Sequence, residues 1–191
     1  MIKVIMLAAG QSKRLKGENK LIKNYKKKPL IVHTINSFKR SKVSKIIFVL
    51  GYQNKEVKKI IKKNKKNIFI YNKNFRKGMA SSIKVGLRKI TRNDKGFIIV
   101  QSDMPFIKTV DIDKIFNSIK LKKFLVYVLK FKNKIGNPIG FDISLIKKFK
   151  NIKGEFGAKF MVKRLKNRTK FIKTSTAKSF KDFDKASDFR I

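Results

Sequence analysis

MIKVIMLAAGQSKRLKGENKLI, residues 1–22, decides how the rest of this chain is interpreted. An apolar run over residues 4–9 ends at Gly10 and gives way to polar residues, which predicts a buried strand that leads into a loop. Small residues at the end of the strand let a ligand approach the backbone, and consecutive backbone N–H groups form a concave site for anions. The stretch therefore predicts a phosphate-binding loop in which Arg14 and Lys20 supply positive charge.

The spacing of this loop resembles the signature of an enzyme family. The motif reads Leu7-Ala8-Ala9-Gly10-x-Ser12-x-Arg14-Leu15-x-Gly17-x-x-Lys20-Leu21. It is similar to the signature loop of the MobA-like nucleotidyltransferases, and most of all to that of their molybdenum cofactor cytidylyltransferase branch. Neither the dinucleotide fingerprint G-x-G-x-x-G nor the Walker loop G-x-x-x-x-G-K-[ST] fits. The resemblance implies a single three-layer α/β/α domain over residues 1–191, with a mostly parallel, Rossmann-like mixed sheet of the nucleotide-diphospho-sugar transferase type.

The same resemblance implies a reaction, NTP + acceptor → nucleotidyl-acceptor + pyrophosphate, and roles for the loop. The nucleotide-binding residues that it implies here are Leu7, Ala8, Ala9, Gly10, Gln11, Ser12, Arg14 and Lys20. Arg14 and Lys20 are also expected to be catalytic, because catalysis of this reaction is mostly positioning and charge neutralisation. No protein base is required if the acceptor is already an anionic phosphate.

A second stretch, residues 74–87, combines a glycine, small hydroxyl residues and a helical pattern. Such a sequence offers caps and exposed N–H groups at a helix N-terminus, which favour anions and polar base edges. A serine in this position more commonly only caps the helix. The segment is, however, similar to the G-M-x-S-S segment of the molybdenum cofactor cytidylyltransferases. The resemblance implies that Gly78, Ser81 and Ser82 bind the nucleotide, with CTP preferred.

A third stretch places a carboxylate directly after the apolar strand expected over residues 96–101. Ligands of open α/β sheets bind at the carboxyl ends of the strands, so Asp103 is expected at the binding edge. An arbitrary Asp in so basic a chain would more commonly be paired with a lysine. The sequence of residues 103–106, D-M-P-F, resembles the metal-binding motif of the family, which implies that Asp103 is catalytic and holds Mg²⁺ on the triphosphate.

Three weaker stretches follow. Residues 136–141 and 153–158 resemble the acceptor-side segments of the family, although as plain sequence both are turns, and the two interpretations weigh about equally. The acceptor-binding residues implied here are Asn137, Pro138 and Gly157. Asn137 replaces a more usual histidine, which leaves the acceptor's identity open. Residues 182–189 resemble the ending D-x-D-T-P-E-D-L, in which Asp184 is the candidate second metal carboxylate and Asp188 is expected to cap or pair structurally.

Strands and helices alternate along the chain, which by default gives parallel strands with helices on both faces of a sheet. Further strands are expected at residues 45–52, 67–72, 96–101, 124–131, 139–141 and 170–173. Helices are expected at residues 30–38, 57–61, 80–90, 112–119 and 156–165, with a last helical turn at 184–189.

Composition limits the functional classes. A chain of 191 residues suits one domain. The absence of Cys excludes disulfides, thiolate nucleophiles and Cys-bound zinc. No apolar run approaches the roughly eighteen residues of a membrane span, and no charged, apolar leader precedes the first strand. A cytoplasmic protein without membrane partners is therefore expected.

The charge is extreme, since 51 Lys and Arg against 11 Asp and Glu give a net charge of +40. Such a charge indicates an anionic partner, namely nucleic acid, a membrane surface or an anionic substrate. The cations are mostly Lys and are spread over the whole chain, which favours a general composition bias over a specific nucleic-acid site. Non-specific, salt-sensitive binding of polyanions is nevertheless expected.

These features favour a Mg²⁺-dependent nucleotidyltransferase that moves CMP from CTP onto a phosphorylated acceptor such as molybdopterin or the molybdenum cofactor. A sugar-phosphate or alditol-phosphate nucleotidyltransferase would use the same loop and differ in the acceptor pocket. A non-enzymatic polyanion-binding protein explains the charge but leaves Asp103 and the loop motif without a reason.

Overall fold

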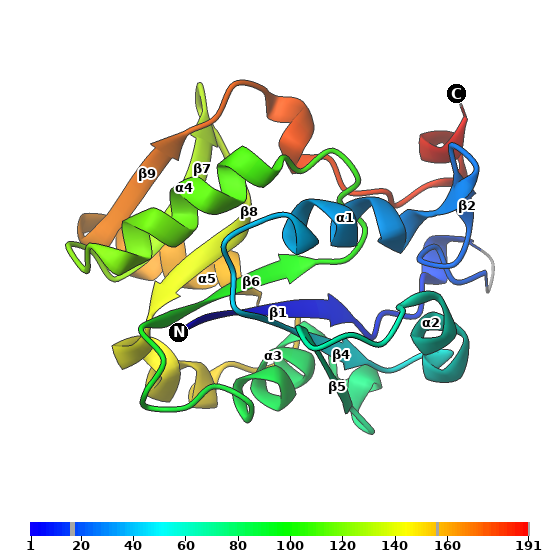
Figure 1. The fold of residues 1–191 in the computed structure, drawn as a ribbon, viewed down its shortest axis with the longest axis horizontal. Coiled ribbons are helices and arrows are strands. Elements are labelled where there is room, and N and C mark those ends of the chain that lie inside the picture. Colours follow the sequence, from blue (N-terminus) through cyan, green and yellow to red (C-terminus); the bar gives the residue numbers. More distant parts are fainter. Residues whose placement is uncertain (16–17, 156, 191) are drawn as a thin grey trace.

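The computed structural model describes residues 1–15, 18–155 and 157–190. Gly17 of the loop motif and Phe156, the expected first residue of a helix, lie outside the described residues. A seven-stranded sheet in the order β5-β4-β1-β6-β8-β7-β9 runs through the molecule, and helices cover both of its faces (Figure 1).

The sheet consists of β1 (Ile2–Ala8), β4 (Lys45–Leu50), β5 (Asn67–Tyr71), β6 (Gly96–Gln101), β7 (Val126–Phe131), β8 (Lys134–Asp142) and β9 (Thr169–Lys173). A separate ribbon pairs β2 (Asn24–Tyr25) with β3 (Lys28–Pro29). The helices are α1 (Leu30–Lys39), α2 (Asn54–Ile60), α3 (Met79–Leu87), α4 (Thr109–Lys120) and α5 (Ala158–Arg164). Short 3₁₀ helices cover Lys13–Leu15, Phe75–Lys77, Ile143–Asn151, Lys166–Arg168, Ala177–Phe180 and Ala186–Phe189.

Strand β8 is the antiparallel member of an otherwise parallel sheet, because it runs opposite to its neighbours β6 and β7. The predicted α/β class with a mostly parallel mixed sheet is confirmed. The expected strand at residues 139–141 was too short, since β8 starts at Lys134. Its apolar pattern is interrupted where the pairing with β7 shifts: Val128 pairs with Ile139 but Leu129 pairs with Gly136, which leaves a bulge between them.

The core lies in two layers, one on each face of the sheet. Alternate residues of β1 serve both layers, with Val4 and Met6 packed beneath α1 and α4, and Ile5 packed beneath α3 and α5. Both faces of the strand are therefore buried, which explains why its sequence is an unbroken apolar run.

The chain leaves β1 through α1 on one face of the sheet and enters β6 from α3 on the other face. Strands β1 and β6 are parallel neighbours, and Leu7 pairs with Gln101 near their carboxyl ends. Ligands of open α/β sheets bind outside the carboxyl ends of the strands, and the loops after β1 and β6 start side by side at that edge. The fold therefore directs the two loops after β1 and β6 to one place.

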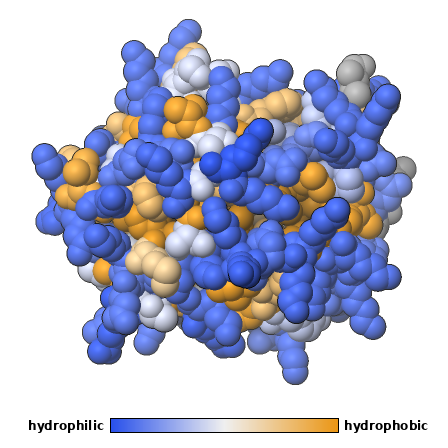
Figure 2. Space-filling model, viewed as in Figure 1, coloured by the Kyte–Doolittle hydropathy of each residue, from blue (hydrophilic) through white to orange (hydrophobic). Residues whose placement is uncertain are grey.

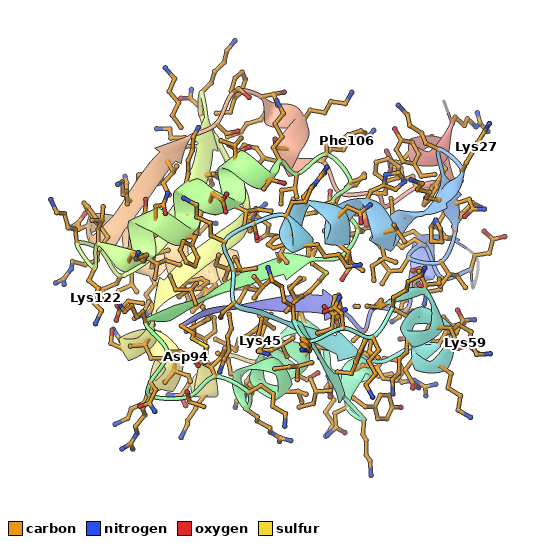
Figure 3. The ribbon with its side chains drawn as sticks, in the orientation of Figure 1. Lys27, Lys45, Lys59, Asp94, Phe106 and Lys122 are labelled. Atoms are coloured by element: carbon orange, nitrogen blue, oxygen red, sulfur yellow. The ribbon has the colours of Figure 1, made fainter. Side chains whose placement is uncertain are left out.

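Hydrophilic side chains cover most of the face seen in Figure 2 and are interrupted by small apolar areas. Basic residues are not gathered in one region, since Lys27, Lys59 and Lys122 lie in separate parts of the molecule (Figure 3). No helix among the described residues is both long and apolar enough to cross a membrane.

Candidate functional site

A cavity of about 280 Å³ opens where β1 and β6 end. Its lining includes many of the predicted nucleotide-binding residues, namely Leu7, Ala9, Gly10, Gln11, Ser12, Lys20, Gly78 and Ser82, together with Asp103. Ala8 is buried in β1. Ala8, Arg14 and Ser81 are not part of the lining. The structure thus brings together the three sequence stretches that were predicted to form one site.

The loop after β1 is closed by its own hydrogen bonds. The backbone N–H of Lys20 donates to Ser12 Oγ at 3.1 Å, and the N–H of Leu15 donates to the Ser12 carbonyl at 2.8 Å. A Cβ atom added at Gly10 would meet no protein atom within 4 Å. The protein itself therefore does not require glycine at this position, and the open space faces the cavity.

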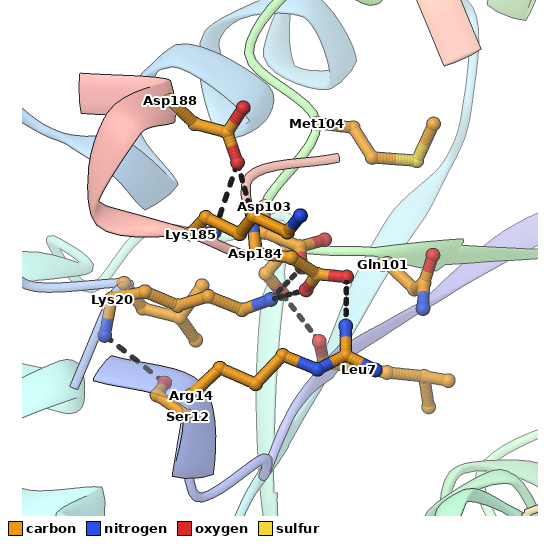
Figure 4. Close-up of polar contacts among 12 residues, drawn as sticks. Leu7, Ser12, Arg14, Lys20, Gln101, Asp103, Met104, Asp184, Lys185 and Asp188 are labelled. Atoms are coloured by element: carbon orange, nitrogen blue, oxygen red, sulfur yellow. Dashed lines mark hydrogen bonds and ion pairs between the residues drawn. The ribbon is translucent and has the colours of Figure 1, made fainter. Parts of the chain in front are cut away.

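Four charged side chains form one ion-pair network beside the cavity (Figure 4). The ammonium nitrogen of Lys20 lies 2.5 Å from Asp103 Oδ2 and 2.8 Å from Asp184 Oδ1. Arg14 Nη1 lies 2.8 Å from Asp184 Oδ2. The structure therefore joins the three predicted catalytic residues and the candidate second metal carboxylate in a single cluster.

Burial sets the pKa of the groups at the centre of this network. Burial raises the pKa of Asp103, and the attraction of Lys20 only partly opposes this shift. Burial also works against the charged form of Lys20, but the carboxylates of Asp103 and Asp184 outweigh it and raise the pKa of Lys20. Lys20 therefore stays an ammonium cation, while the buried Asp103 carboxylate needs positive charge next to it.

Neighbouring hydroxyl groups fix the loop that carries Asp103. Ser102 Oγ donates to the Leu7 carbonyl at 2.7 Å and ties the end of β6 to β1. Thr34 Oγ1 on α1 donates to the Ser102 carbonyl at 2.9 Å and accepts from the Met104 N–H at 3.2 Å. These contacts hold Asp103 between two elements. The role of Thr34 could not be predicted from the sequence, because it depends on tertiary packing.

The C-terminal segment that carries Asp184 is anchored by aromatic residues. The Phe183 side chain is 1% exposed and packs edge-on against Tyr25 and Phe189, with ring centroids 4.9 and 5.2 Å away. Its backbone N–H donates to the Asp103 carbonyl at 3.1 Å. Asp184 is therefore held at the site by a packed segment of the chain.

Asp188 organises the same segment through its backbone. Its Oδ2 atom accepts the N–H groups of Asp184 and Lys185, each at 2.9 Å (Figure 4), and its Oδ1 lies 3.1 Å from the ammonium group of Lys181. The two backbone donors lower the pKa of Asp188 to about 2. This is the structural capping role that the sequence predicted for Asp188.

The N-terminus of α3 differs from the sequence-based expectation of exposed N–H groups. The Met79 N–H donates to Glu155 Oε2 at 3.3 Å, and the Ala80 N–H donates to the Gly154 carbonyl at 3.0 Å. Backbone N–H groups that were expected to face a ligand therefore donate to Glu155 and Gly154 instead. This packing brings Glu155 into the lining of the cavity, a position that the motif alone did not reveal.

Asn72 orients both serines of α3. Its Nδ2 donates to Ser81 Oγ at 2.8 Å and to Ser82 Oγ at 3.0 Å. Ser81 Oγ bonds further to the carbonyls of Asn74 and Gly78, both at 2.9 Å, and so has a capping role. Ser82 lines the cavity and Ser81 does not. Ser81 therefore has the capping role that is the commoner one for such a serine, whereas Ser82, for which the resemblance implied a contact with the base, faces the cavity.

A second cavity of about 240 Å³ adjoins the first and shares Leu7, Met79, Gln101 and Glu155 with it. Two of the predicted acceptor-binding residues, Asn137 and Gly157, line this second cavity. The third, Pro138, is buried and does not line it. Asn137 and Pro138 occupy the bulge of β8, and Asn137 Nδ2 donates to Gln101 Oε1 at 3.0 Å.

The donor set beside the first cavity fits a divalent metal ion. Asp103 and Asp184 already share one cation, the ammonium group of Lys20. The Oδ1 atom of Asp103 is buried without a hydrogen-bond partner. Residues 1–15, 18–155 and 157–190 contain no cluster of three or more His, Cys, Asp or Glu side chains that could hold a metal. Mg²⁺ suits such a site, because it takes one or two protein carboxylates together with phosphates and waters.

The sequence of this chain matches those of known proteins. The family model described as "MobA-like NTP transferase domain" matches residues 4–169. The bifunctional enzyme IspD/IspF of Pelagibacter ubique (strain HTCC1062) is 32% identical over 148 residues, 75% of this chain and 38% of that protein. The 3-deoxy-manno-octulosonate cytidylyltransferase of Wigglesworthia glossinidia brevipalpis is 30% identical over 127 residues, 66% of this chain and 50% of that protein. The chain thus spans between about two fifths and one half of the length of these relatives.

Solved structures share the fold. The crystal structure of Rv0371c from Mycobacterium tuberculosis H37Rv superposes with a TM-score of 0.83 at 19% identity and covers 98% of this chain and 95% of that one. A structure of Rv0371c in complex with manganese gives a TM-score of 0.75 at 15% identity, over 91% and 88% of the two chains. At such identities the likeness shows the architecture alone, and it confirms the predicted α/β class.

Proposed function

Since the chain belongs to the MobA-like NTP transferase family, we propose that it transfers a nucleoside monophosphate from an NTP to a small phosphorylated acceptor and releases pyrophosphate. The observation that carries this proposal is the network of Arg14, Lys20, Asp103 and Asp184 beside the cavity. The network pairs two cations suited to phosphates with two carboxylates suited to a metal.

The residues of the network have different roles in nucleotide binding and catalysis. Lys20 and Arg14 neutralise the phosphates of the nucleotide, and the backbone of residues 10–12 supports them with N–H groups. Ser12 keeps the loop closed through the Lys20 N–H. The acceptor oxygen attacks the α-phosphorus in line, so the protein acts mainly by positioning the two substrates in adjoining cavities.

Asp103 and Asp184 are proposed to hold a divalent metal ion, with Mg²⁺ as the natural choice. When bound, the ion supplies charge neutralisation and a template for the phosphate oxygens. The manganese complex of Rv0371c supports a divalent metal in proteins of this fold. With a cation held there by Asp103 and Asp184, the ammonium group of Lys20, which these carboxylates now pair, would be available to a phosphate.

CTP is the proposed nucleotide. The segment from Gly78 to Ser82 resembles that of the cytidylyltransferase branch, and the Wigglesworthia relative is named as a cytidylyltransferase. Ser82 is 5% exposed, lines the first cavity and is held in place by Asn72, which suits a contact with a base.

Two acceptor classes are proposed. A molybdopterin-type acceptor follows from the loop resemblance. A sugar-phosphate or alditol-phosphate acceptor is favoured by Asn137, which stands where the molybdenum branch usually has histidine.

The test is a pyrophosphate-release assay with each of the four NTPs and Mg²⁺, with a molybdopterin-type acceptor, with an alditol phosphate and without acceptor. We expect CTP to be used best and release to depend on an acceptor. Productive use of GTP with CTP inert would move the assignment to a guanylyltransferase. No binding of any NTP in the presence of Mg²⁺ would refute the proposed function.

A further inference from the structure

We propose that the second cavity recognises hydrogen-bond donors on the acceptor, and that Asp182 is the specificity-determining residue that accepts from them. The proposal rests on the nucleotidyl-transfer function proposed above and narrows its acceptor to a class. That class is a phosphate carried on a skeleton with hydroxyl or amino groups.

The two adjoining cavities differ in charge. The lining of the first cavity has three basic side chains, Lys13, Lys20 and Arg76, against the two acids Asp103 and Glu155. The lining of the second cavity has a single basic side chain, Lys159, against the two acids Glu155 and Asp182. This composition is unusual in a chain with 51 basic and 11 acidic residues. Phosphates are therefore favoured in the first cavity, whereas neutral or cationic donor groups are favoured in the second.

The part of the chain that the structure describes gives Asp182 no hydrogen-bond or ion-pair partner. Its side chain is half-buried, and its carboxylate forms no hydrogen bond or ion pair with any residue in 1–15, 18–155 and 157–190. Its charge acts on the carboxylate of Asp103, which it repels. A half-buried carboxylate near another carboxylate is stabilised by a donor. The described residues provide none, so a bound acceptor is the natural source.

Asn137 adds a second unused acceptor atom to the same cavity. Its Nδ2 donates to Gln101, but its Oδ1 is buried and lacks a partner. A buried oxygen without a donor is unfavourable, and a ligand hydroxyl or amine that donates to it offsets this cost. The bulge of β8 places Asn137 here. Two elements far apart in the chain thus offer acceptor atoms to one ligand.

Asp182 could instead be a further metal ligand, but its position argues against this role. It lines the second cavity and is absent from the lining of the first, which contains Asp103. The two roles predict different results for Asp182→Asn. A metal ligand would leave the preference among acceptors unchanged, whereas a residue that accepts from the acceptor reduces that preference.

The experiment compares three probes of equal carbon length, namely hexitol phosphate, aminohexyl phosphate and hexyl phosphate. Their binding to the full chain is measured by ligand-observed NMR titration, so no turnover is required. We expect hexitol phosphate or aminohexyl phosphate to bind at least about tenfold more tightly than hexyl phosphate, as for one good hydrogen bond to a charged group. The stronger of these two identifies the donor as hydroxyl or amine. Asp182→Asn and Asn137→Leu should each reduce this preference several-fold.

Controls separate the possible failures. Glu56→Gln removes an exposed acid on α2 that lines neither cavity and should keep the full preference. Thermal melting checks the folding of each variant, and Asp182→Glu, which retains the carboxylate, should restore part of the preference if Asp182→Asn is unstable. Equal binding of the three probes to the wild type, or an undiminished preference in a folded Asp182→Asn, would overturn the inference. NTP binding that persists in either case leaves the proposed function intact.

Discussion

Asp103 carries a charge that the ligand-free fold does not need. Its side chain is buried, Oδ1 has no partner, and burial raises its pKa, so the carboxylate at pH 7 costs stability. We expect Asp103→Asn to be as stable as the wild type or more stable by on the order of 1 kcal/mol, a rise in Tm of about 2–4 °C. Lys20 keeps Asp184 as its partner in the variant.

When Mg²⁺ and CTP are added together, the wild type should have a higher Tm than Asp103→Asn. The ligands should raise the Tm of the wild type and leave that of Asp103→Asn nearly unchanged, because only the wild type offers the buried carboxylate to the metal. Differential scanning fluorimetry with and without the ligands measures both effects. A variant that melts well below the ligand-free wild type would show that Asp103 is a structural residue.

Asp188 makes the opposite contribution to stability, because its pKa is lowered to about 2 by the N–H groups of Asp184 and Lys185. A lowered carboxyl pKa stabilises the fold above the unfolded value of about 3.9, and this contribution is lost as the pH falls toward 2. Asp188→Asn should therefore be less stable at pH 6, by on the order of 1 kcal/mol after solvent screening. Urea unfolding at pH 6 and pH 3 should show the gap closing at the lower pH, whereas a gap of constant size would contradict the assignment.

At the residue scale, the site residues that belong to a local sequence motif could be predicted. Asp103 follows closely after the apolar strand β6, and Lys20 belongs to the loop that leaves the apolar strand β1 at the same edge of the sheet. The ion pair of Arg14 with Asp184 spans 170 positions, and spacing alone gives no information on such a contact. Thr34, Asn72 and Asp182 were missed for the same reason, because their neighbours come from other elements.

At the scale of elements, the fold requires glycine at position 78, whereas at position 10 we expect only a bound ligand to require it. Gly78 has a φ of +94°, and an added Cβ would lie 2.5 Å from the Gly154 carbonyl oxygen. Gly78→Ala should separate α3 from the turn at residues 153–158 and cost about 1–3 kcal/mol of stability. Chemical denaturation measures this loss.

Gly10→Ala is the matched variant, since its Cβ would meet no protein atom within 4 Å. It should melt within a degree or two of the wild type but bind CTP with Mg²⁺ at least about tenfold more weakly, because the methyl group occupies space meant for the ligand. Calorimetry of CTP binding supplies this comparison. Unchanged affinity in Gly10→Ala would place the nucleotide elsewhere.

Apolar patterns in the sequence predict some strands completely and others only in part. The fully buried strands β1, β4 and β6 were predicted, because both of their faces are apolar. Only the end of β8 was predicted, since its bulge interrupts the alternation where Asn137 is turned toward the cavity. A structural irregularity at a candidate site is thus the feature that the pattern could not predict.

At the scale of the whole molecule, the net charge of +40 and the candidate site predict binding of different ligands with different salt dependence. Binding of DNA or RNA should be indifferent to sequence and should fall roughly a thousandfold between about 50 mM and about 200 mM salt, because it depends on counterion release. Binding of CTP with Mg²⁺ should survive the same change far better, since short-range contacts in a partly closed cavity hold it. Titrations of both ligands at the two salt concentrations make the comparison. A defined RNA or DNA that stays bound at high salt with base specificity would contradict this account.

The most direct measurement follows the fate of the nucleotide itself. CTP labelled in the α-phosphate is incubated with Mg²⁺ and each phosphorylated acceptor, and the pyrophosphate released is compared with the label joined to acceptor. We predict equal molar amounts of the two products for the wild type, and a rate lower by about 10²–10³-fold or more for Asp103→Asn. Pyrophosphate without labelled acceptor, or an undiminished rate in Asp103→Asn, would contradict the central claim that this site transfers a nucleotidyl group.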